Sequence, residues 1–308
     1  IWQFFIILGV FGGIGASMVG VVPAQSLVSR WFDKNLGTAL SIAYAGQGLG
    51  VLIMAPISQI LIDDVGWQLS YEYISYIFVF LLIIASILPW NIISKGSKNN
   101  PRKTFNGKAV GGISLIKALK EKTFWGFFFI FCFTAVGIFG ISLHVVAYLV
   151  YVGLSEVQAA FSFGIAGMLN FVGMVLTGLA ADKWPRHIVA SVSYLLSFIA
   201  IFSLALMQLY PSIIFLILFI LGFGLSAGAR GPIITTLMAE IFAGKGLASI
   251  YGATNLGQGL GAAAGALLAG FLFDLTGGYN FGFLICTAFT FLGAVLFWTV
   301  PQIRHAKI

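Results

Sequence analysis

The chain contains two copies of one sequence pattern, and this repeat decides its fold. The first copy reads PAQSLVSRWFDKNLGTALSI (residues 23–42), followed by AGQGLG (45–50). The second copy reads PIITTLMAEIFAGKGLASI (232–250), followed by LGQGLG (256–261). An internal repeat of this length predicts two structurally equivalent halves in one chain.

The composition indicates which solvent surrounds these halves. Hydrophobic residues make up 60% of the 308 residues and charged residues only 8%, which is too few to cover a water-soluble surface. Apolar stretches long enough to cross a hydrocarbon core as a helix, about 20 residues, recur along the chain. We predict nine spans: 2–28, 36–62, 67–90, 124–150, 156–181, 187–209, 212–241, 248–273 and 281–300.

Lysine and arginine residues fall in every second loop between these spans, whereas the intervening loops carry acidic residues and no basic residue. Basic residues of short loops are retained on the cytoplasmic side, so the pattern predicts a multi-pass protein of the cell membrane with a cytoplasmic C-terminus. The net charge of +7 then reflects topology rather than a nucleic-acid partner. Arg230 is the only one of the 16 basic residues outside the cytoplasmic loops.

The repeat also predicts how the chain is divided. Three spans precede the second copy within its half, whereas none precedes the first copy, and the chain starts at Ile1 within a span. We therefore expect three N-terminal spans of a longer protein to be missing. Residues 1–90 are predicted to form a partial N-terminal half, residues 91–123 a basic cytoplasmic linker with a short amphipathic helix, and residues 124–308 a complete six-span half.

Two six-span halves in parallel repeat, joined by a long basic linker, resemble the major facilitator superfamily. The loop GLAADKWPR (178–186) is similar to the superfamily's Gly-x-x-x-Asp-[Arg/Lys]-x-Gly-Arg loop, with Pro185 in place of the glycine. Two stretches, SRWFDKNLGTALSIAYAGQGLG (29–50) and HVVAYLVYVGLS (144–155), are similar to the monocarboxylate and oxalate/formate branch. The resemblance implies an all-α integral membrane fold, with nine of the twelve transmembrane helices of the family present in two pseudo-symmetric halves.

The resemblance further implies that spans 2–28, 124–150 and 212–241 line the transport cavity, which places Arg230 on a cavity helix. The same branch carries its anion-binding arginine or lysine in the spans that correspond to 156–181 or 248–273, and neither contains one here. An ionised arginine in mid-membrane costs at least about 2.5 to 3.5 kcal/mol, so Arg230 should face protein or water rather than lipid.

Several polar residues are predicted to lie at a similar depth to Arg230, and together they form the candidate substrate site. They are Gln258, Asn255, Gln47, Tyr44 and Asn170. A guanidinium can hold a carboxylate through two parallel hydrogen bonds, with amide and phenol groups completing the shell. In the alternative interpretation, Arg230 caps carbonyl groups opened by Gly231 and Pro232, or extends towards the headgroups.

Two further sets of residues have predicted roles. His144 can titrate near neutral pH and is a candidate for proton coupling, and a packing histidine explains it equally well. The resemblance implies a cytoplasmic gate at Asp182, which pairs with nearby bases or with a helix N-terminus when the gate is closed. The bases assigned to that gate are Lys183, Arg186 and Arg30.

Glycines at four-residue spacing predict close helix packing. Gly257, Gly261 and Gly265, followed by Ala269, form such a stripe in span 248–273, and Gly46 with Gly50 form a shorter one in span 36–62.

These features together predict a secondary active transporter of a small organic anion, monocarboxylate-like, that works by alternating access and is driven by proton symport or anion exchange. Its expected partners are the anion, the lipid bilayer and protons, and we expect a monomer. The sequence has no phosphate-binding Gly-Lys-Ser/Thr loop and no metal-ligand spacing, so we expect no cofactor, no metal and no enzyme activity. The alternatives are a drug or neutral-metabolite carrier of the same superfamily and a non-transporting sensor with the transporter fold.

Overall fold

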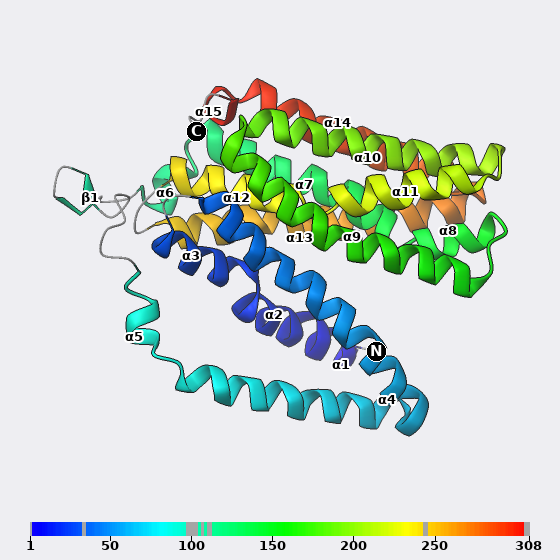
Figure 1. The fold of residues 1–308 in the computed structure, drawn as a ribbon, viewed down its shortest axis with the longest axis horizontal. Coiled ribbons are helices and arrows are strands. Elements are labelled where there is room, and N and C mark those ends of the chain that lie inside the picture. The colour runs from blue at the N-terminus through cyan, green and yellow to red at the C-terminus, as the bar shows by residue number, and fades with distance from the viewer. Residues whose placement is uncertain are drawn as a thin grey trace.

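The computed structural model of the chain is almost entirely helical (Figure 1), as the sequence predicts. It describes residues 2–32, 35–96, 104–105, 108–109, 113–242 and 246–304, and the side chain of Gln47 lies outside that description. Within these ranges the only strands are β1 (Thr104–Phe105) and β2 (Lys108–Ala109), which pair antiparallel.

The first group of helices corresponds to the predicted N-terminal spans. It consists of α1 (Trp2–Phe4), the π-helix η1 (Phe5–Gly12), α2 (Gly13–Val19), α3 (Val21–Trp31), α4 (Leu36–Ile87) and α5 (Trp90–Ile93). The predicted spans 36–62 and 67–90 form two arms of α4, residues 36–65 and 67–87, which meet at Gly66. Gly66 has a φ of 82°, a backbone conformation that a residue without Cβ adopts at little cost, so the chain reverses there.

The second group of helices forms a bundle. It consists of α6 (Leu115–Ala118), α7 (Lys122–Ser142), α8 (Val145–Tyr151), α9 (Glu156–Lys183), α10 (Arg186–Leu209), α11 (Ile213–Ser226), α12 (Arg230–Ile241), α13 (Leu247–Thr276), α14 (Asn280–Thr299) and α15 (Pro301–Arg304). Two predicted spans are interrupted: 124–150 is divided into α7 and α8 near His144, and 212–241 into α11 and α12 at residues 227–229. The amphipathic helix predicted in the linker is the single turn α6.

Among the described residues, seven helices are long and apolar enough to cross a membrane. The predicted number of nine spans stays a prediction, because span 2–28 is divided at Gly20 and span 36–62 includes side chains that the structure does not describe.

Glycines hold α7 tightly against α13. A Cβ built at any of three glycines of α13 would overlap a backbone carbonyl oxygen of α7, which confirms the predicted packing stripe. The three contacts are Gly257 with Phe128, Gly261 with Cys132, and Gly265 with Val136. The stripe predicted in span 36–62 has no such partner, since a Cβ at Gly46 or Gly50 would meet no described atom within 4 Å.

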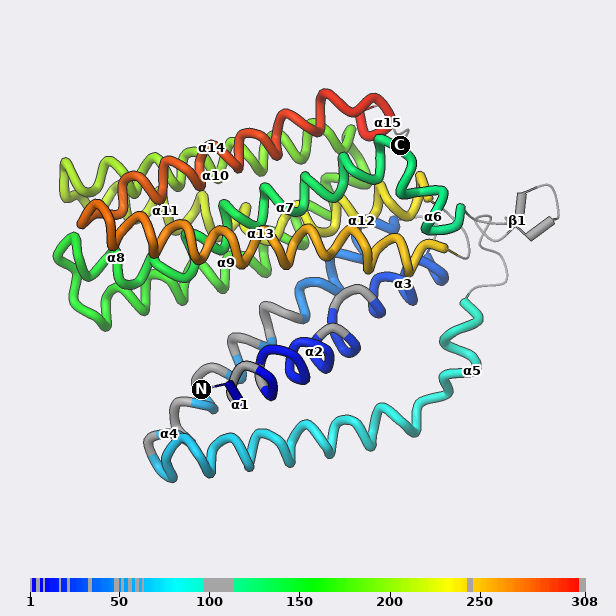
Figure 2. Tube along the Cα trace, turned by 180° about the vertical axis from the view of Figure 1, so that it is seen from behind, coloured from blue at the N-terminus to red at the C-terminus, as the bar shows by residue number. Residues whose placement is uncertain are grey.

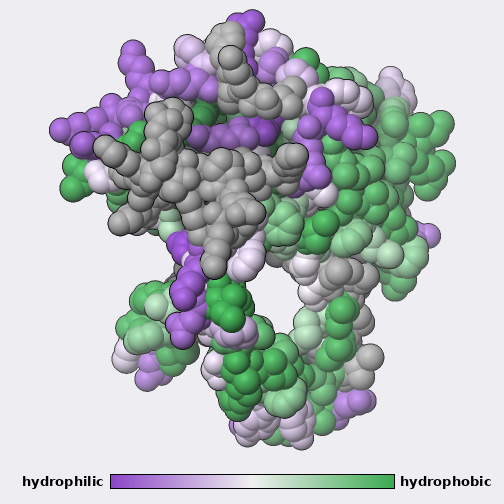
Figure 3. All heavy atoms as spheres, turned by 60° about the vertical axis from the view of Figure 1, so that its left-hand side comes forward, coloured by the Kyte–Doolittle hydropathy of each residue, from purple (hydrophilic) through white to green (hydrophobic). Residues whose placement is uncertain are grey.

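The two groups of helices meet at one end of the molecule (Figures 1 and 2). There α3 and the first arm of α4 pack against α9, α12 and α13, whereas α1, α2 and the second arm of α4 diverge from the bundle towards the other end. The end where they meet also carries α6 and α15, and we name it the basic end. Figure 3, which brings this end forward, shows hydrophilic residues gathered over it and apolar residues over the sides.

Candidate functional site

The break between α11 and α12 creates the centre of the candidate site. The backbone N–H of Gly228 lies in this break and donates to Oδ1 of Asn170 on α9, at 2.8 Å. Backbone groups freed inside a membrane need such partners, since no water is available in the hydrocarbon core. Asn170 therefore supports the break in span 212–241, and its predicted contact with substrate stays a prediction.

Arg230 is the first residue of α12, and its guanidinium points towards α10. The side chain is 1% exposed, and Nη1 donates to Oγ of Ser197 at 2.9 Å and more weakly to the carbonyl oxygen of Ser193 at 3.4 Å. The guanidinium carbon lies 4.4 Å from the centroid of the Tyr194 ring, a cation–π distance. The Tyr194 hydroxyl in turn hydrogen-bonds with Oγ1 of Thr134 on α7, at 2.6 Å. Arg230 thus joins α12 to α10, and through Tyr194 to α7.

One edge of the Arg230 guanidinium has no hydrogen-bond partner in the part of the chain that the structure describes. Its Nε and Nη2 atoms are buried, and neither donates to a described residue. No Asp or Glu of the described residues forms an ion pair with Arg230. The Nε–H and one Nη2–H bond run parallel, which is the arrangement that matches the two oxygens of a carboxylate. The arginine is therefore buried with a carboxylate-binding edge that none of the described residues occupies.

Tyr44 brings the first group of helices to this position. A Cβ at Gly231, the neighbour of Arg230, would lie 3.0 Å from Cε1 of Tyr44, so the tyrosine ring packs directly on the start of α12. The Tyr44 hydroxyl lies towards the side chains of Thr235 on α12 and Gln25 on α3. Gln25 is buried and was not predicted from the sequence, since it lies beside a loop with many polar residues.

The structure shows no contact between the Arg230 guanidinium and the remaining predicted substrate ligands among the described residues. Asn255 is half-buried and Gln258 is exposed on α13, which presents its glycine stripe to α7. The side chain of Gln47 lies outside the described residues. The residues that do contact Arg230 are Ser193, Tyr194 and Ser197, and sequence reasoning missed them. Their spacing on α10, three polar groups within one turn of an apolar span, was the available signal.

Asp182 of α9 binds the N-terminus of α4 at the basic end. Its Oδ1 accepts the N–H of Gly37 at 2.9 Å, while Oδ2 accepts the N–H and Oγ1–H of Thr38 at 2.8 and 2.6 Å. The N-cap residue of α4, Asn35, makes no side-chain cap hydrogen bond, so Asp182 supplies one from another helix. Of the two partners predicted for Asp182, the structure thus shows the helix N-terminus.

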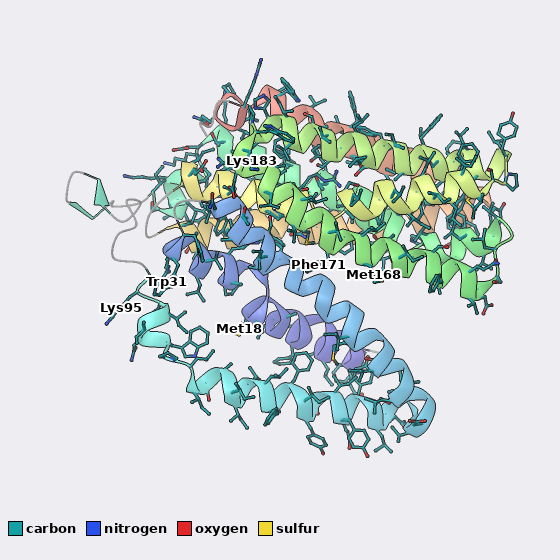
Figure 4. The ribbon with its side chains drawn as sticks, in the orientation of Figure 1. Met18, Trp31, Lys95, Met168, Phe171 and Lys183 are labelled. Carbon is teal, nitrogen blue, oxygen red and sulfur yellow. The ribbon has the colours of Figure 1, made fainter. Side chains whose placement is uncertain are left out.

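The bases assigned to the gate make other contacts. Both Nη atoms of Arg186 bind the carboxylate of Glu240, with Nη2 at 2.7 Å from Oε1, which joins the start of α10 to the end of α12. Arg30 donates to the carbonyl oxygen of Ser94 at 2.9 Å, and the neighbouring Trp31 donates to Ile93, so α3 is fixed to the start of the linker. Lys183 is exposed at the end of α9, where Figure 4 labels it.

Neutralising Asp182 should open the contact between α4 and α9. We expect Asp182→Asn to raise maleimide labelling of a cysteine placed at the buried Ser41, which covers Gly178 of α9, by about tenfold. The reason is that a carboxylate accepting three hydrogen bonds is replaced by a neutral amide. The measurement uses the complete protein with Cys132 and Cys286 replaced by alanine. Asp274→Asn, an exposed acid at the end of α13 away from the basic end, is the matched control, and equal labelling in both variants would refute the role of Asp182.

His144 lies at the junction of α7 and α8. Its Nε2 is 3.1 Å from the carbonyl oxygen of Ala266 on α13, and its ring lies beside that of Tyr279. The histidine thereby ties the interrupted span to α13, and its part in proton coupling stays a prediction. Among the described residues, no group of three or more His, Cys, Asp and Glu side chains is placed to hold a metal ion.

Comparison with known proteins finds a matching family model and several similar transporters. The family model described as Major Facilitator Superfamily matches residues 1–249. Monocarboxylate transporter 13 of Rattus norvegicus is 25% identical over 303 residues, which cover 97% of this chain and 67% of that transporter. Monocarboxylate transporter 12 of Mus musculus is 26% identical over 333 residues, covering 98% and 67%. The uncharacterized MFS-type transporter YcxA of Bacillus subtilis (strain 168) is 25% identical over 299 residues, covering 95% and 71%.

Proposed function

Because this chain belongs to the Major Facilitator Superfamily, whose model matches most of its length, we propose that it is a secondary active transporter of a small organic monocarboxylate. The names of two of its relatives, both monocarboxylate transporters, support this substrate class. The observation that carries the proposal is the buried Arg230, whose Nε and Nη2 atoms have no partner among the described residues.

In this proposal the carboxylate of the substrate binds the Nε and Nη2 edge of Arg230. The ion pair offsets the cost of burying a lone guanidinium, which is several kcal/mol. Tyr44 lies against the next residue of α12 and provides a hydroxyl from the other group of helices. Gln47, Asn255 and Gln258 are proposed to contact the rest of the substrate.

Alternating access then requires the contacts at the basic end to open and close. Asp182 holds the N-terminus of α4, and Leu36 and Leu40 of α4 are buried in one hydrophobic cluster with α12 and α13. The two groups of helices diverge at the opposite end (Figure 1), so this conformation is closed at the basic end. We propose that the basic end is cytoplasmic. Proton symport, with His144 as a candidate, or exchange for a second anion supplies the drive.

A neutral-substrate carrier is the second candidate, and one observation favours it. The Nη1 atom of Arg230 binds Ser197, and the guanidinium stacks on Tyr194, so the arginine already links three helices of the bundle. If Arg230 serves only to link these helices, the substrate need carry no charge.

Competition between carboxylates and their amides distinguishes the two candidates. The complete protein is reconstituted in liposomes, and counterflow of labelled lactate and pyruvate is measured with unlabelled carboxylates or the matching amides as competitors. We expect the amides to compete at least about tenfold more weakly, because they cannot form a charged pair with Arg230. Equal competition by the amides, or transport of neutral solutes alone, would exclude the carboxylate proposal. An imposed pH gradient, compared with an outward anion gradient, identifies the drive.

A further inference from the structure

The turn α6 and the start of α7 form a surface of exposed apolar and positive side chains at the basic end, and we name it the α6 platform. Its apolar members are Ile116, Leu119 and Trp125, which are 72%, 40% and 44% exposed, and its positive members are the exposed Lys117, Lys120 and Lys122. The half-buried Glu121 is the one acidic residue within it, so the platform carries a net positive charge.

The apolar part of the α6 platform continues into the side of the helical bundle. Trp125 donates from Nε1 to the carbonyl oxygen of Leu119 at 3.0 Å, which fixes its ring, and the ring contacts Phe128 and Phe129 of α7. Phe129 is itself 39% exposed on the apolar face of a helix long enough to span a membrane. The platform therefore lies where the hydrocarbon-facing surface of α7 passes into the charged end, which is the depth of lipid headgroups.

The opposite face of the same turn is part of the contact that closes the basic end. Ala118 is fully buried, and Leu115 and Ile113 pack in the same hydrophobic cluster as Leu36 and Leu40 of α4. The carbonyl group of Ile113 also abuts Gly246, directly before α13 begins. One turn of helix thus has its inner face in the closed contact and its outer face at the membrane surface.

We infer that the α6 platform binds the headgroup of an anionic phospholipid of the adjacent leaflet, and that this binding stabilises the closed basic end. Lys117, Lys120 and Lys122 attract the phosphate, while Ile116 and Trp125 insert among the acyl chains. A protein partner fits less well, since the platform is continuous with the surface that the bilayer covers. This inference concerns the fold alone and holds whichever substrate is transported.

Quenching of tryptophan fluorescence by brominated lipids tests the binding. The complete protein is reconstituted in phosphatidylcholine, and brominated phosphatidylcholine or brominated phosphatidylglycerol is titrated in. The difference between the wild type and Trp125→Phe isolates the signal of Trp125. We expect that signal to favour phosphatidylglycerol by about tenfold in apparent affinity, and the triple variant Lys117→Gln, Lys120→Gln, Lys122→Gln to remove the preference.

The control removes exposed positive charge from other places at the same end, through Lys95→Gln combined with Arg304→Gln, and should keep the preference. Equal quenching by the two lipids, an unchanged preference in the triple variant, or full competition by dissolved glycerol phosphate would each overturn lipid binding. Closure of the basic end is measured by maleimide labelling of Ser41→Cys. Phosphatidylglycerol should slow this labelling when the three lysines are present, and should leave it unchanged when Ser41→Cys is combined with the triple variant. If phosphatidylglycerol did not slow the labelling with the three lysines present, lipid binding would not stabilise the closed basic end.

Discussion

Lysine in place of Arg230 is expected to lower the kcat/KM of carboxylate uptake by at least about thirtyfold, although the positive charge is retained. A loss of this size corresponds to about 2 kcal/mol, the lower range measured when one partner of a buried, hydrogen-bonded charge pair is removed. An ammonium group cannot present two parallel N–H bonds, so Arg230→Lys removes the Nε and Nη2 edge that has no partner among the described residues. The measurement is the initial rate of labelled carboxylate uptake by the complete protein in liposomes.

The substitution Arg230→Met distinguishes an anion-binding role of Arg230 from a purely structural one. The two roles predict changes in melting temperature of opposite sign. If Arg230 binds the substrate anion, its charge is buried without a counter-charge in the substrate-free protein. Removing that charge should then raise the melting temperature of the substrate-free protein and abolish uptake. If Arg230 serves to link α12 to Ser197 and Tyr194, the same variant should melt earlier and still transport. Ser197→Ala is the matched control, because it removes the acceptor of Nη1 and leaves the other edge intact. The second outcome would refute the anion site.

The class of fold could be predicted from the sequence because it depends on quantities that are local in sequence. Apolar length and the positions of basic residues indicate membrane helices, and the repeat indicates two related groups of them. The position of Asp182 could also be anticipated, since its loop is similar to a known motif and a carboxylate near a helix N-terminus is attracted to it. The structure shows it bound to the first turn of α4.

The surroundings of Arg230 could not be predicted in the same way. Counting residues along a helix gives the depth of a side chain in the membrane, and the five residues predicted to surround Arg230 were chosen by this depth. The direction of a side chain depends on the rotation of the helix about its axis, which residue counting does not give; Ser226 and Arg230, four residues apart, both face Ser197 of α10. Arg230 contacts Ser193, Tyr194 and Ser197 of α10. Asn170, predicted as a ligand, accepts the N–H of Gly228 in the break between α11 and α12.

Alanine in place of Gly261 is expected to destabilise the protein by about 3 kcal/mol, the upper range for overpacking a buried contact. A Cβ at this position would overlap the carbonyl oxygen of Cys132 and lie 2.8 to 2.9 Å from its carbonyl carbon and Cα atom. All three are backbone atoms, so no side chain can rotate away, and α7 must move from α13. The melting temperature of the purified protein, measured at one fixed heating rate, reports the change.

Gly259→Ala provides a control on the same helix, two residues away. A Cβ at Gly259 would meet no described atom within 4 Å, so this substitution adds helix propensity, up to about 1 kcal/mol, without a steric cost. The two variants make the same chemical change in the same helix, and we expect shifts of opposite sign. If Gly261→Ala were as stable as Gly259→Ala, α7 and α13 would not be in backbone contact along the glycine stripe. Since α7 is also one of the helices that holds Arg230, through Thr134 and Tyr194, the loss of this contact should reduce carboxylate uptake in the Gly261 variant alone.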